Sequence, residues 1–229
     1  MARIIFIETS TKLCSTALSE DGKIISVKEN ADREHASLTA PFVKEMLDEH
    51  GLKVRDCDAV CVSAGPGSYT GLRVGASTAK GLCFGAGIPL IGTGSLDTLV
   101  WQAIGEGLLP EGCKHIVPMI DARRMEVYTA VFNPDGTQTK ATEARIVDET
   151  SFSDLLSDGP VLFIGDGAGK CSGTIKSPNA HFIQTCPKAC SMLIPAERLF
   201  QAGKFENTAY FEPFYLKQFV PTVSKRKIL

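Results

Sequence analysis

An internal repeat constrains the fold of this chain more strongly than any other feature of its sequence. In both halves an acidic residue closes a β-rich run, a Thr-Ala-hydrophobic triplet begins eight residues later, and an Asp-Gly turn follows. The first copy comprises Glu8, Thr16–Leu18 and Asp21-Gly22, and the second comprises Asp121, Thr129–Val131 and Asp135-Gly136. Because Asp-Gly favours a tight hairpin, each copy predicts a three-stranded meander.

Both meanders continue into a helix and a further strand. Helical spacing over 35–50 precedes a strand at 59–63, and the run Val161–Gly167 echoes Val60–Gly67. A parallel strand after each meander needs a right-handed helical crossover. Two βββα runs can look alike by chance, but repetition of the whole unit favours a duplication. We therefore predict an α/β protein with a duplicated ribonuclease-H-like (actin/Hsp70-like, ASKHA) fold, in which helices flank two lobes of mixed β-sheet.

The repeat divides the 229 residues into two expected lobes, 1–106 and 107–229. A net charge of −2 shows no basic excess, so we expect the chain alone to bind RNA only weakly. The first residues lack the apolar run of a signal peptide or a membrane span. We accordingly expect a cytoplasmic protein without membrane contact.

Metal and cofactor chemistry are not predicted. No two of the histidines, at 35, 50, 115 and 181, are three or four residues apart, as a helix-borne metal site requires. The eight cysteines contain no Cys-x-x-Cys pair, and we expect them to be reduced and mostly buried. No nucleophile, base and acid can be recognised from spacing, so no catalytic residue is assigned.

The glycine-rich run Ser63–Gly75 leads from a predicted strand into a predicted helix, Leu72–Gly85. Its spacing fits neither a dinucleotide fingerprint, nor a P-loop, nor a nucleophile elbow. A tight structural turn is the favoured interpretation, and an anion site at the helix N-terminus is the alternative. Gly65, Gly67 and Ser68 are weak candidates for that site.

A second glycine run, Gly165–Lys170, superficially resembles a phosphate loop. Ile164 and Cys171 stand where a Walker motif needs Gly and Ser or Thr. Gly167 is therefore retained only as a weak ligand-binding candidate.

Two helices carry features that suggest a partner interface. Apolar residues in the first helix form two adjacent stripes, more than one buried face needs, and Pro41 must open or kink that helix. In the second helix, small residues four apart allow another backbone to approach closely, internally or from another chain. The predicted interface comprises Leu38, Phe42, Met46, Gly71, Gly75 and Ala79.

Several motifs together resemble the TsaB (YeaZ) family over nearly the whole chain. The matching segments are Ile7–Ser10, Arg33–His35, Ser63–Gly75, Ala79–Gly81, Ile120–Tyr128, Phe163–Gly167 and Pro213–Lys217. The resemblance implies a paralogue of TsaD, the enzyme that transfers threonylcarbamoyl to N6 of adenosine 37 in tRNA, with the same duplicated fold.

The differences from TsaD imply a non-catalytic scaffold. The chain lacks the His-x-x-x-His metal pair of TsaD, and Thr11 and Lys12 stand where TsaD places Cys and Asp. The resemblance implies a TsaD-like catalytic subunit and a TsaE-like ATPase as partners, tRNA contact only through that complex, and a possible homodimer when the chain is alone. An active ATP-dependent transferase or kinase of the same fold, and a peptidase-like protein, are the alternatives.

Overall fold

The computed structural model describes residues 2–32 and 35–217 and contains two five-stranded sheets with the same strand order. The first sheet has the order β3-β2-β1-β4-β5 and the second β8-β7-β6-β9-β10. The strands of the first are β1 (Arg3–Glu8), β2 (Cys14–Glu20), β3 (Lys23–Asn30), β4 (Ala59–Gly65) and β5 (Leu90–Gly94). Those of the second are β6 (His115–Asp121), β7 (Glu126–Phe132), β8 (Gln138–Ile146), β9 (Val161–Ile164) and β10 (Ala180–Ile183).

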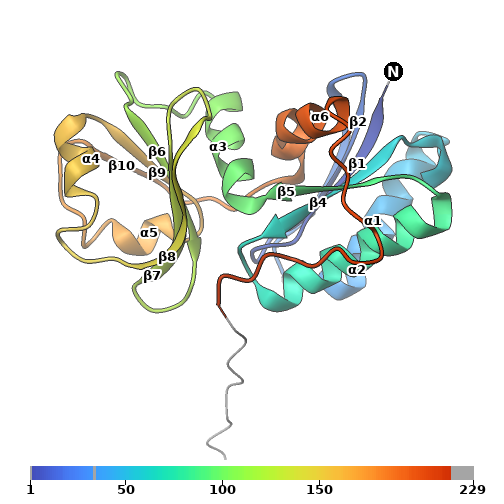
Figure 1. Ribbon diagram of the computed structural model, residues 1–229, viewed down its shortest axis with the longest axis horizontal. Helices are drawn as coiled ribbons and strands as arrows, with labels where there is room; N and C mark the ends of the chain where they lie inside the picture. The colour runs from blue at the N-terminus through green and yellow to red at the C-terminus, as the bar shows by residue number, and fades with distance from the viewer. Residues whose placement is uncertain (1, 33–34, 218–229) are drawn as a thin grey trace, which may run out of the picture.

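Equivalent strands of the two sheets pair in the same directions. β1 and β6 each run antiparallel to the following strand and parallel to β4 or β9. Asp21 and Gly22, at φ 51° and 74°, form the turn between β2 and β3, as their sequence predicts. The duplication and the two-lobed ASKHA fold are therefore confirmed, and Figure 1 shows the two sheets side by side.

Helices α1 (His35–Glu49) and α2 (Tyr69–Ala86) cover one face of the first sheet, with the short η1 (Val54–Asp56) between them in sequence. Pro41 lies inside α1 and does not open it. The Ser68 side chain caps α2 by accepting a hydrogen bond from the Gly71 amide, so α2 begins three residues before the predicted Leu72.

The second sheet has its own short helices, α4 (Ser153–Asp158) and α5 (Ala168–Cys171), on one face. Phe152, Leu155 and Cys171 pack there against apolar residues of the second sheet. The strand-strand-strand-helix-strand order is thus present in both halves.

Each sheet is completed by a helix from the other half of the sequence. α3 (Ser95–Gly105) packs through Leu96, Leu99, Val100 and Ala103 on the second sheet. Conversely, η2 (Ala189–Met192) and α6 (Leu193–Gln201) pack on the first sheet. The predicted boundary, which assigned 1–106 and 107–229 to separate lobes, therefore needs correction: residues 95–105 and 189–201 belong to the lobe opposite their own half. Figure 1 shows α3 and α6 between the two sheets.

Beyond α6, residues 206–217 form what we call the C-terminal strap. The Glu206 amide donates to the Leu90 carbonyl, and the Phe214 amide donates to the Ala64 carbonyl, so the strap follows the first lobe. Lys217 then forms an ion pair with Glu126 of the second lobe. The strap thus ties the two lobes together on the surface.

No helix in the described part of the chain is long and apolar enough to cross a membrane. Arg33 and Glu34 of the predicted family motifs, and Lys225, Arg226 and Lys227 near the C-terminus, lie outside the described residues.

Candidate functional site

The two lobes meet where β1 and β4 of one sheet, and β6 and β9 of the other, end at loops. Glu8 closes β1, and the Gly65–Ser68 turn follows β4. Asp121 closes β6, and Asp166 follows β9. The carboxyl ends of parallel strands are the usual ligand-binding edge of α/β sheets, so this junction, which we call the inter-lobe site, is the first candidate site.

Glu8 is a fully buried carboxyl group at this edge. Its Oε1 accepts a hydrogen bond from the Ser10 amide at 2.6 Å. Burial raises the pKa of Glu8 from 4.5 to about 7, although the neighbouring Ser10 and Ser63 partly counteract this, and the negative charge of Asp166 raises it further. Sequence analysis placed Glu8 at the end of the strand but could not show that its side chain is buried near Asp166.

Asp166 of the second lobe is near enough to Glu8 for its negative charge to raise the pKa of that carboxyl. Burial is also the main cause that raises the pKa of Asp166, while the positive charges of Lys12 and Lys170 lower it. Lys12 is exposed and belongs to the loop between β1 and β2. The inter-lobe site therefore has a positive charge of the protein itself, that of Lys12, close to the carboxyl group of Asp166.

The weak ligand-binding candidates of the first glycine run are in contact with the chain itself. The Ser68 amide donates to the Ser10 carbonyl at 2.6 Å, and the Ser68 hydroxyl caps α2. A Cβ atom on Gly67 would lie closer than 3.0 Å to the Ser10 carbonyl oxygen, and one on Gly65 would meet the Phe214 carbonyl. Gly65, at φ 104°, is also in a conformation that favours glycine. This geometry accounts for both glycines without a ligand.

Gly167 is placed in the same way in the second lobe. Its amide donates to the Met119 carbonyl at 3.0 Å, and a Cβ atom would press on Val127 and Ile120. Nearby, Lys170 donates to the Asp121 carboxylate and, at 2.6 Å, to the Glu126 carbonyl. Among residues 2–32 and 35–217, no three His, Cys, Asp or Glu side chains are grouped so that they could hold a metal ion.

The predicted partner interface is only partly at the surface. Met46 is fully buried in the first lobe's core, whereas Leu38 and Phe42 are half-buried on α1. All three residues of the second predicted stripe, Gly71, Gly75 and Ala79, are buried as well. Four of the six predicted residues, Met46, Gly71, Gly75 and Ala79, therefore face the protein's own core.

Gly71 and Gly75 of α2 lie where the helix packs closely on β1, β4 and the residue that follows β1, so a larger side chain has no space there. A Cβ atom on Gly71 would lie closer than 3.0 Å to the Thr9 carbonyl oxygen. One on Gly75 would lie equally close to Thr9 Oγ1 and 3.3 Å from Val62 Cγ2. The close helix approach that the sequence indicated is thus internal, and the outward assignment of these glycines is corrected.

A different row of small residues on α2 faces outward. Ser77, Gly81 and Gly85 are exposed and follow one another at four-residue spacing. A Cβ atom on Gly81 or Gly85 would meet no atom of residues 2–32 and 35–217 within 4 Å, and Phe84 beside them is 87% exposed. The sequence contained this row, but the pattern alone did not show which of the two rows points away from the sheet.

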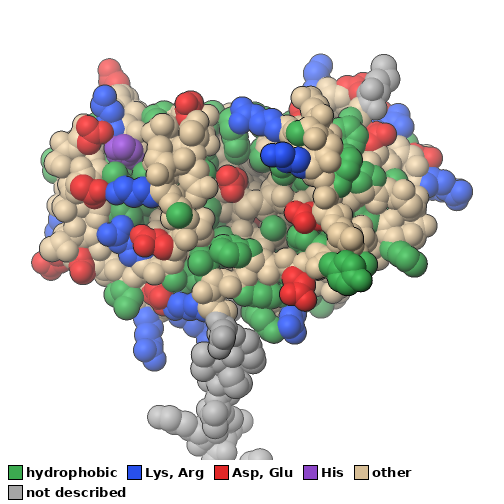
Figure 2. All heavy atoms as spheres, viewed as in Figure 1, with side chains coloured by type: hydrophobic (Ala, Val, Ile, Leu, Met, Phe, Trp, Pro, Cys, Tyr) green, Lys and Arg blue, Asp and Glu red, His purple; other side chains and the backbone are tan. Residues whose placement is uncertain are grey.

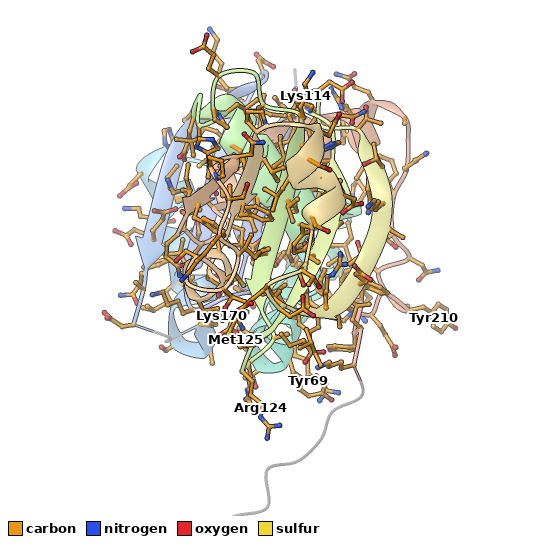
Figure 3. The ribbon with its side chains drawn as sticks, turned by 90° about the vertical axis from the view of Figure 1, so that its left-hand side faces the viewer. Tyr69, Lys114, Arg124, Met125, Lys170 and Tyr210 are labelled. Atoms are coloured by element: carbon orange, nitrogen blue, oxygen red, sulfur yellow. The ribbon has the colours of Figure 1, made fainter. Side chains whose placement is uncertain are left out.

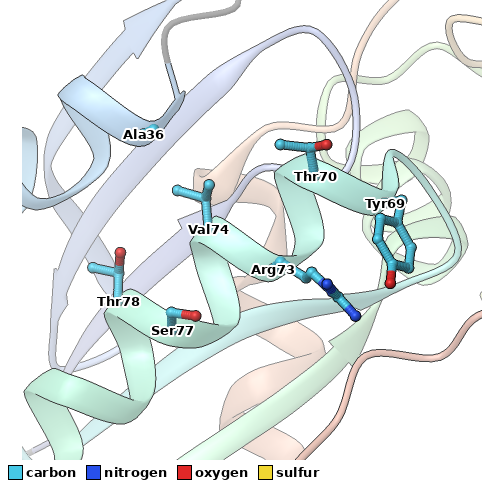
Figure 4. A pocket seen from close by; sticks show the side chains of 7 residues that line it. All are labelled: Ala36, Tyr69, Thr70, Arg73, Val74, Ser77 and Thr78. Carbon is cyan, nitrogen blue, oxygen red and sulfur yellow. The ribbon is translucent and has the colours of Figure 1, made fainter.

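A shallow pocket of about 460 Å³ continues this surface toward the start of α2. Figure 4 shows Thr70, Val74 and Thr78 along one line of α2, with Tyr69, Arg73 and Ser77 along the next. Ala36 contributes the α1 side of the pocket. We call the outer face of α1 and α2, from this pocket to Gly85, the helical surface.

Comparison with known proteins connects this geometry to one group. The family model of TsaD, tRNA N6-adenosine threonylcarbamoyltransferase, matches residues 24–208. The chain is 34% identical to the tRNA threonylcarbamoyladenosine biosynthesis protein TsaB of Escherichia coli over 94% of both chains. It is 32% identical to TsaB of Bacillus subtilis over 71% of this chain and 70% of that one. YeaZ from Pseudomonas aeruginosa superimposes with a TM-score of 0.80 at 26% identity, covering 94% of this chain and all of that one.

Proposed function

This chain belongs to the TsaB (YeaZ) family, and we propose that it takes part in tRNA threonylcarbamoyladenosine biosynthesis as a non-catalytic subunit that supports a TsaD-like enzyme in the cytoplasm. The names of the relatives supply the pathway. The match to the TsaD family model supports a fold shared by the two subunits. The roles that we propose for this chain within that pathway are supported by its helical surface and by the inter-lobe site.

The outward row of α2 is the observation that carries the partner role. A glycine inside a helix costs about 1 kcal/mol relative to alanine. For Gly75 the close packing on β1 offsets this cost, but in the described part of the chain Gly81 and Gly85 have no neighbour that a side chain at these positions would displace. Exposed glycines beside the exposed Phe84 would allow a helix of another chain to approach the backbone of α2 closely.

The residues of the inter-lobe site support a non-catalytic role. Its glycine turns are occupied by internal contacts, and Lys12 brings a positive charge close to Asp166. A positive side chain disfavours a second cation at the same carboxylate. We therefore assign no catalytic residue to this chain. A TsaE-like ATPase is a further proposed member of the complex. The complex as a whole, and not this chain alone, would bind the tRNA.

The test is a matched pair of glycine substitutions. Gly81→Leu places a four-carbon side chain on the helical surface, whereas Gly105→Leu does the same at the end of α3, where a Cβ atom also meets nothing within 4 Å. Both variants should fold and melt at or above the wild-type temperature. Gly81→Leu should fail to co-purify with the TsaD-like subunit of the same genome, and Gly105→Leu should retain it.

A complex fully retained by Gly81→Leu would remove α2 from the interface. Light scattering of the isolated chain gives a second readout. If two copies occupy the helical surface in the absence of the partner, wild type should form a dimer and Gly81→Leu a monomer. A monomeric wild type that also fails to bind the TsaD-like subunit would overturn the proposed role.

A further inference from the structure

The loop between β6 and β7 presents two adjacent arginines at the surface. Arg123 and Arg124 are both exposed, and neither side chain has a hydrogen bond or ion pair with any residue in the described ranges. Their φ angles are 70° and 49°, a left-handed conformation that residues other than glycine rarely adopt. Internal contacts of the side chains do not account for this arrangement.

The surrounding structure holds the loop in place and neutralises its acidic residues. Asp121 accepts hydrogen bonds from the Arg123 amide and from Lys170. Glu126 forms an ion pair with Lys217 of the strap. Asp166, which accepts a hydrogen bond from the Asp121 amide, is near both Lys12 and Lys170. The three acids are thus matched by Lys12, Lys170 and Lys217, so the charges of Arg123 and Arg124 remain as a local excess on a chain whose net charge is −2.

Aromatic residues lie at the same end of the molecule. Figure 3 shows Tyr69, Arg124, Met125 and Lys170 toward the lower end of the molecule, at the opposite end from Lys114. Tyr69 packs against Tyr215 of the strap, with ring centroids 4.9 Å apart. Figure 2 shows basic side chains projecting from this lower edge.

The strap carries further groups of the same kind to this place. Phe214 is 50% exposed, three residues before Lys217 reaches the loop. Basic and aromatic side chains are therefore combined where the two lobes and the strap meet.

We propose that the β6–β7 loop, through Arg123 and Arg124, is a contact site for the phosphate backbone of RNA. Two unpaired guanidinium groups held on a fixed turn match phosphate oxygens, which arginine binds through paired hydrogen bonds. Phe214, which is 50% exposed on the strap that reaches Glu126, favours a nucleic acid over an acidic protein, because bases stack on exposed aromatic rings. The role is to position RNA and not to read its sequence, since phosphate contacts carry no base information.

This inference rests on the proposed function, because two arginines alone bind RNA only weakly at physiological salt. Tyr69 and Arg73 line the pocket of the helical surface and also contact Tyr215 or one another at the loop's end of the molecule. The loop therefore lies beside the partner surface, and RNA held by a bound TsaD-like enzyme could reach it. The contact adds to the affinity of the complex.

The experiment measures tRNA binding to the complex of this chain with the TsaD-like subunit. Fluorescence anisotropy with labelled tRNA is recorded over a series of salt concentrations for wild type and for Arg123→Ala/Arg124→Ala. The matched control, Arg55→Ala/Lys204→Ala, removes two exposed positive charges elsewhere that likewise lack side-chain partners in the described ranges. Arg123→Lys/Arg124→Lys keeps the charge and removes the paired donors.

The loop variant should bind tRNA about tenfold more weakly at physiological salt, and the slope of log affinity against log salt should fall by about 2. The lysine variant should keep the wild-type slope, and the control should match wild type throughout. Equal binding by the loop variant and the control would overturn the proposal. So would loss of the protein complex in the loop variant, which would assign the arginines to an acidic protein surface.

The proposed function and this inference fail in different ways. If wild type does not bind the TsaD-like subunit at all, the proposed function fails. If the wild-type complex forms and binds tRNA, and the arginine substitutions leave its tRNA affinity unchanged, only the proposed RNA contact fails. Thermal melting of each variant shows whether the chain itself is intact.

Discussion

Gly75→Ala should destabilise the protein although it replaces a helical glycine with the best helix former. The added Cβ atom would lie closer than 3.0 Å to Thr9 Oγ1 and 3.3 Å from Val62 Cγ2. Thr9 Oγ1 donates a buried hydrogen bond of 2.8 Å to the Gly71 carbonyl, so Thr9 cannot move away without losing it. The substitution must therefore shift α2, rotate Thr9, or both.

The magnitude follows from three contributions. Overpacking a core costs about 1–3 kcal/mol, and a buried hydrogen bond lost with one partner left unpaired costs about 1–3 kcal/mol. Helix propensity returns about 1 kcal/mol. We expect a net loss near 3 kcal/mol in the free energy of unfolding. For a chain of this size that lowers Tm by about 6–12 °C.

Differential scanning calorimetry of Gly75→Ala and Gly81→Ala tests this directly. Gly81 lies on the same helix with nothing within 4 Å of an added Cβ atom, so only the propensity gain remains. Its variant should melt about 2–4 °C above wild type. If Gly75→Ala melts at or above wild type, the inner packing of α2 described above is wrong.

Three further results are expected. Because burial raises the pKa of Glu8 to about 7, the native state keeps a proton that the unfolded state releases above about 4.5, so wild-type stability should fall between these pH values. In urea denaturation at pH 5 and pH 8, Glu8→Gln should remove about 2–4 kcal/mol of that fall. An unchanged pH dependence would refute the burial of this carboxyl. Calorimetric titration of the isolated chain with Mg-ATP should show no binding, whereas stoichiometric binding in the low micromolar range would contradict the non-catalytic role of the inter-lobe site. Arg198→Ala should lower Tm by about 1–4 °C and change the emission of Trp101, because the guanidinium lies 4.4 Å from the indole centroid across the two lobes; unchanged emission would exclude that contact.

The duplicated fold could be predicted from sequence because its signals are local. Asp21-Gly22 and Asp135-Gly136 fix hairpins, and the strands around them alternate or run apolar as sheets require. The exchange of α3 and α6 could not be predicted in this way. The pattern of Leu96, Leu99 and Ala103 shows that α3 has a buried face, but it does not show which sheet that face meets.

The partner surface shows the same limit on a single helix. Residues 71, 75 and 79 and residues 77, 81 and 85 form two rows of small side chains on α2 with the same spacing. Spacing alone cannot distinguish a glycine that admits the protein's own strand from one that is left open. The apolar neighbours Leu72, Ala76 and Cys83 mark the inner side, and they were the available signal. The electrostatic effect of Asp166 on Glu8 depends on how the lobes meet, which no local pattern encodes.

The exchanged helices also bear on how the protein is made on the ribosome. Ile4 and Phe6 of β1 are covered on one face by Met192 and Ala196, so this face stays open until nearly 200 residues have been synthesised. At about 5–20 residues per second, the roughly 100 residues between the end of β5 at Gly94 and Ala196 take about 5–20 s to synthesise. During that time the apolar face of the first sheet is exposed on the nascent chain, where it can cause aggregation or bind a chaperone. The first lobe, although complete in its strands after residue 94, can reach its native packing only when the last helix emerges.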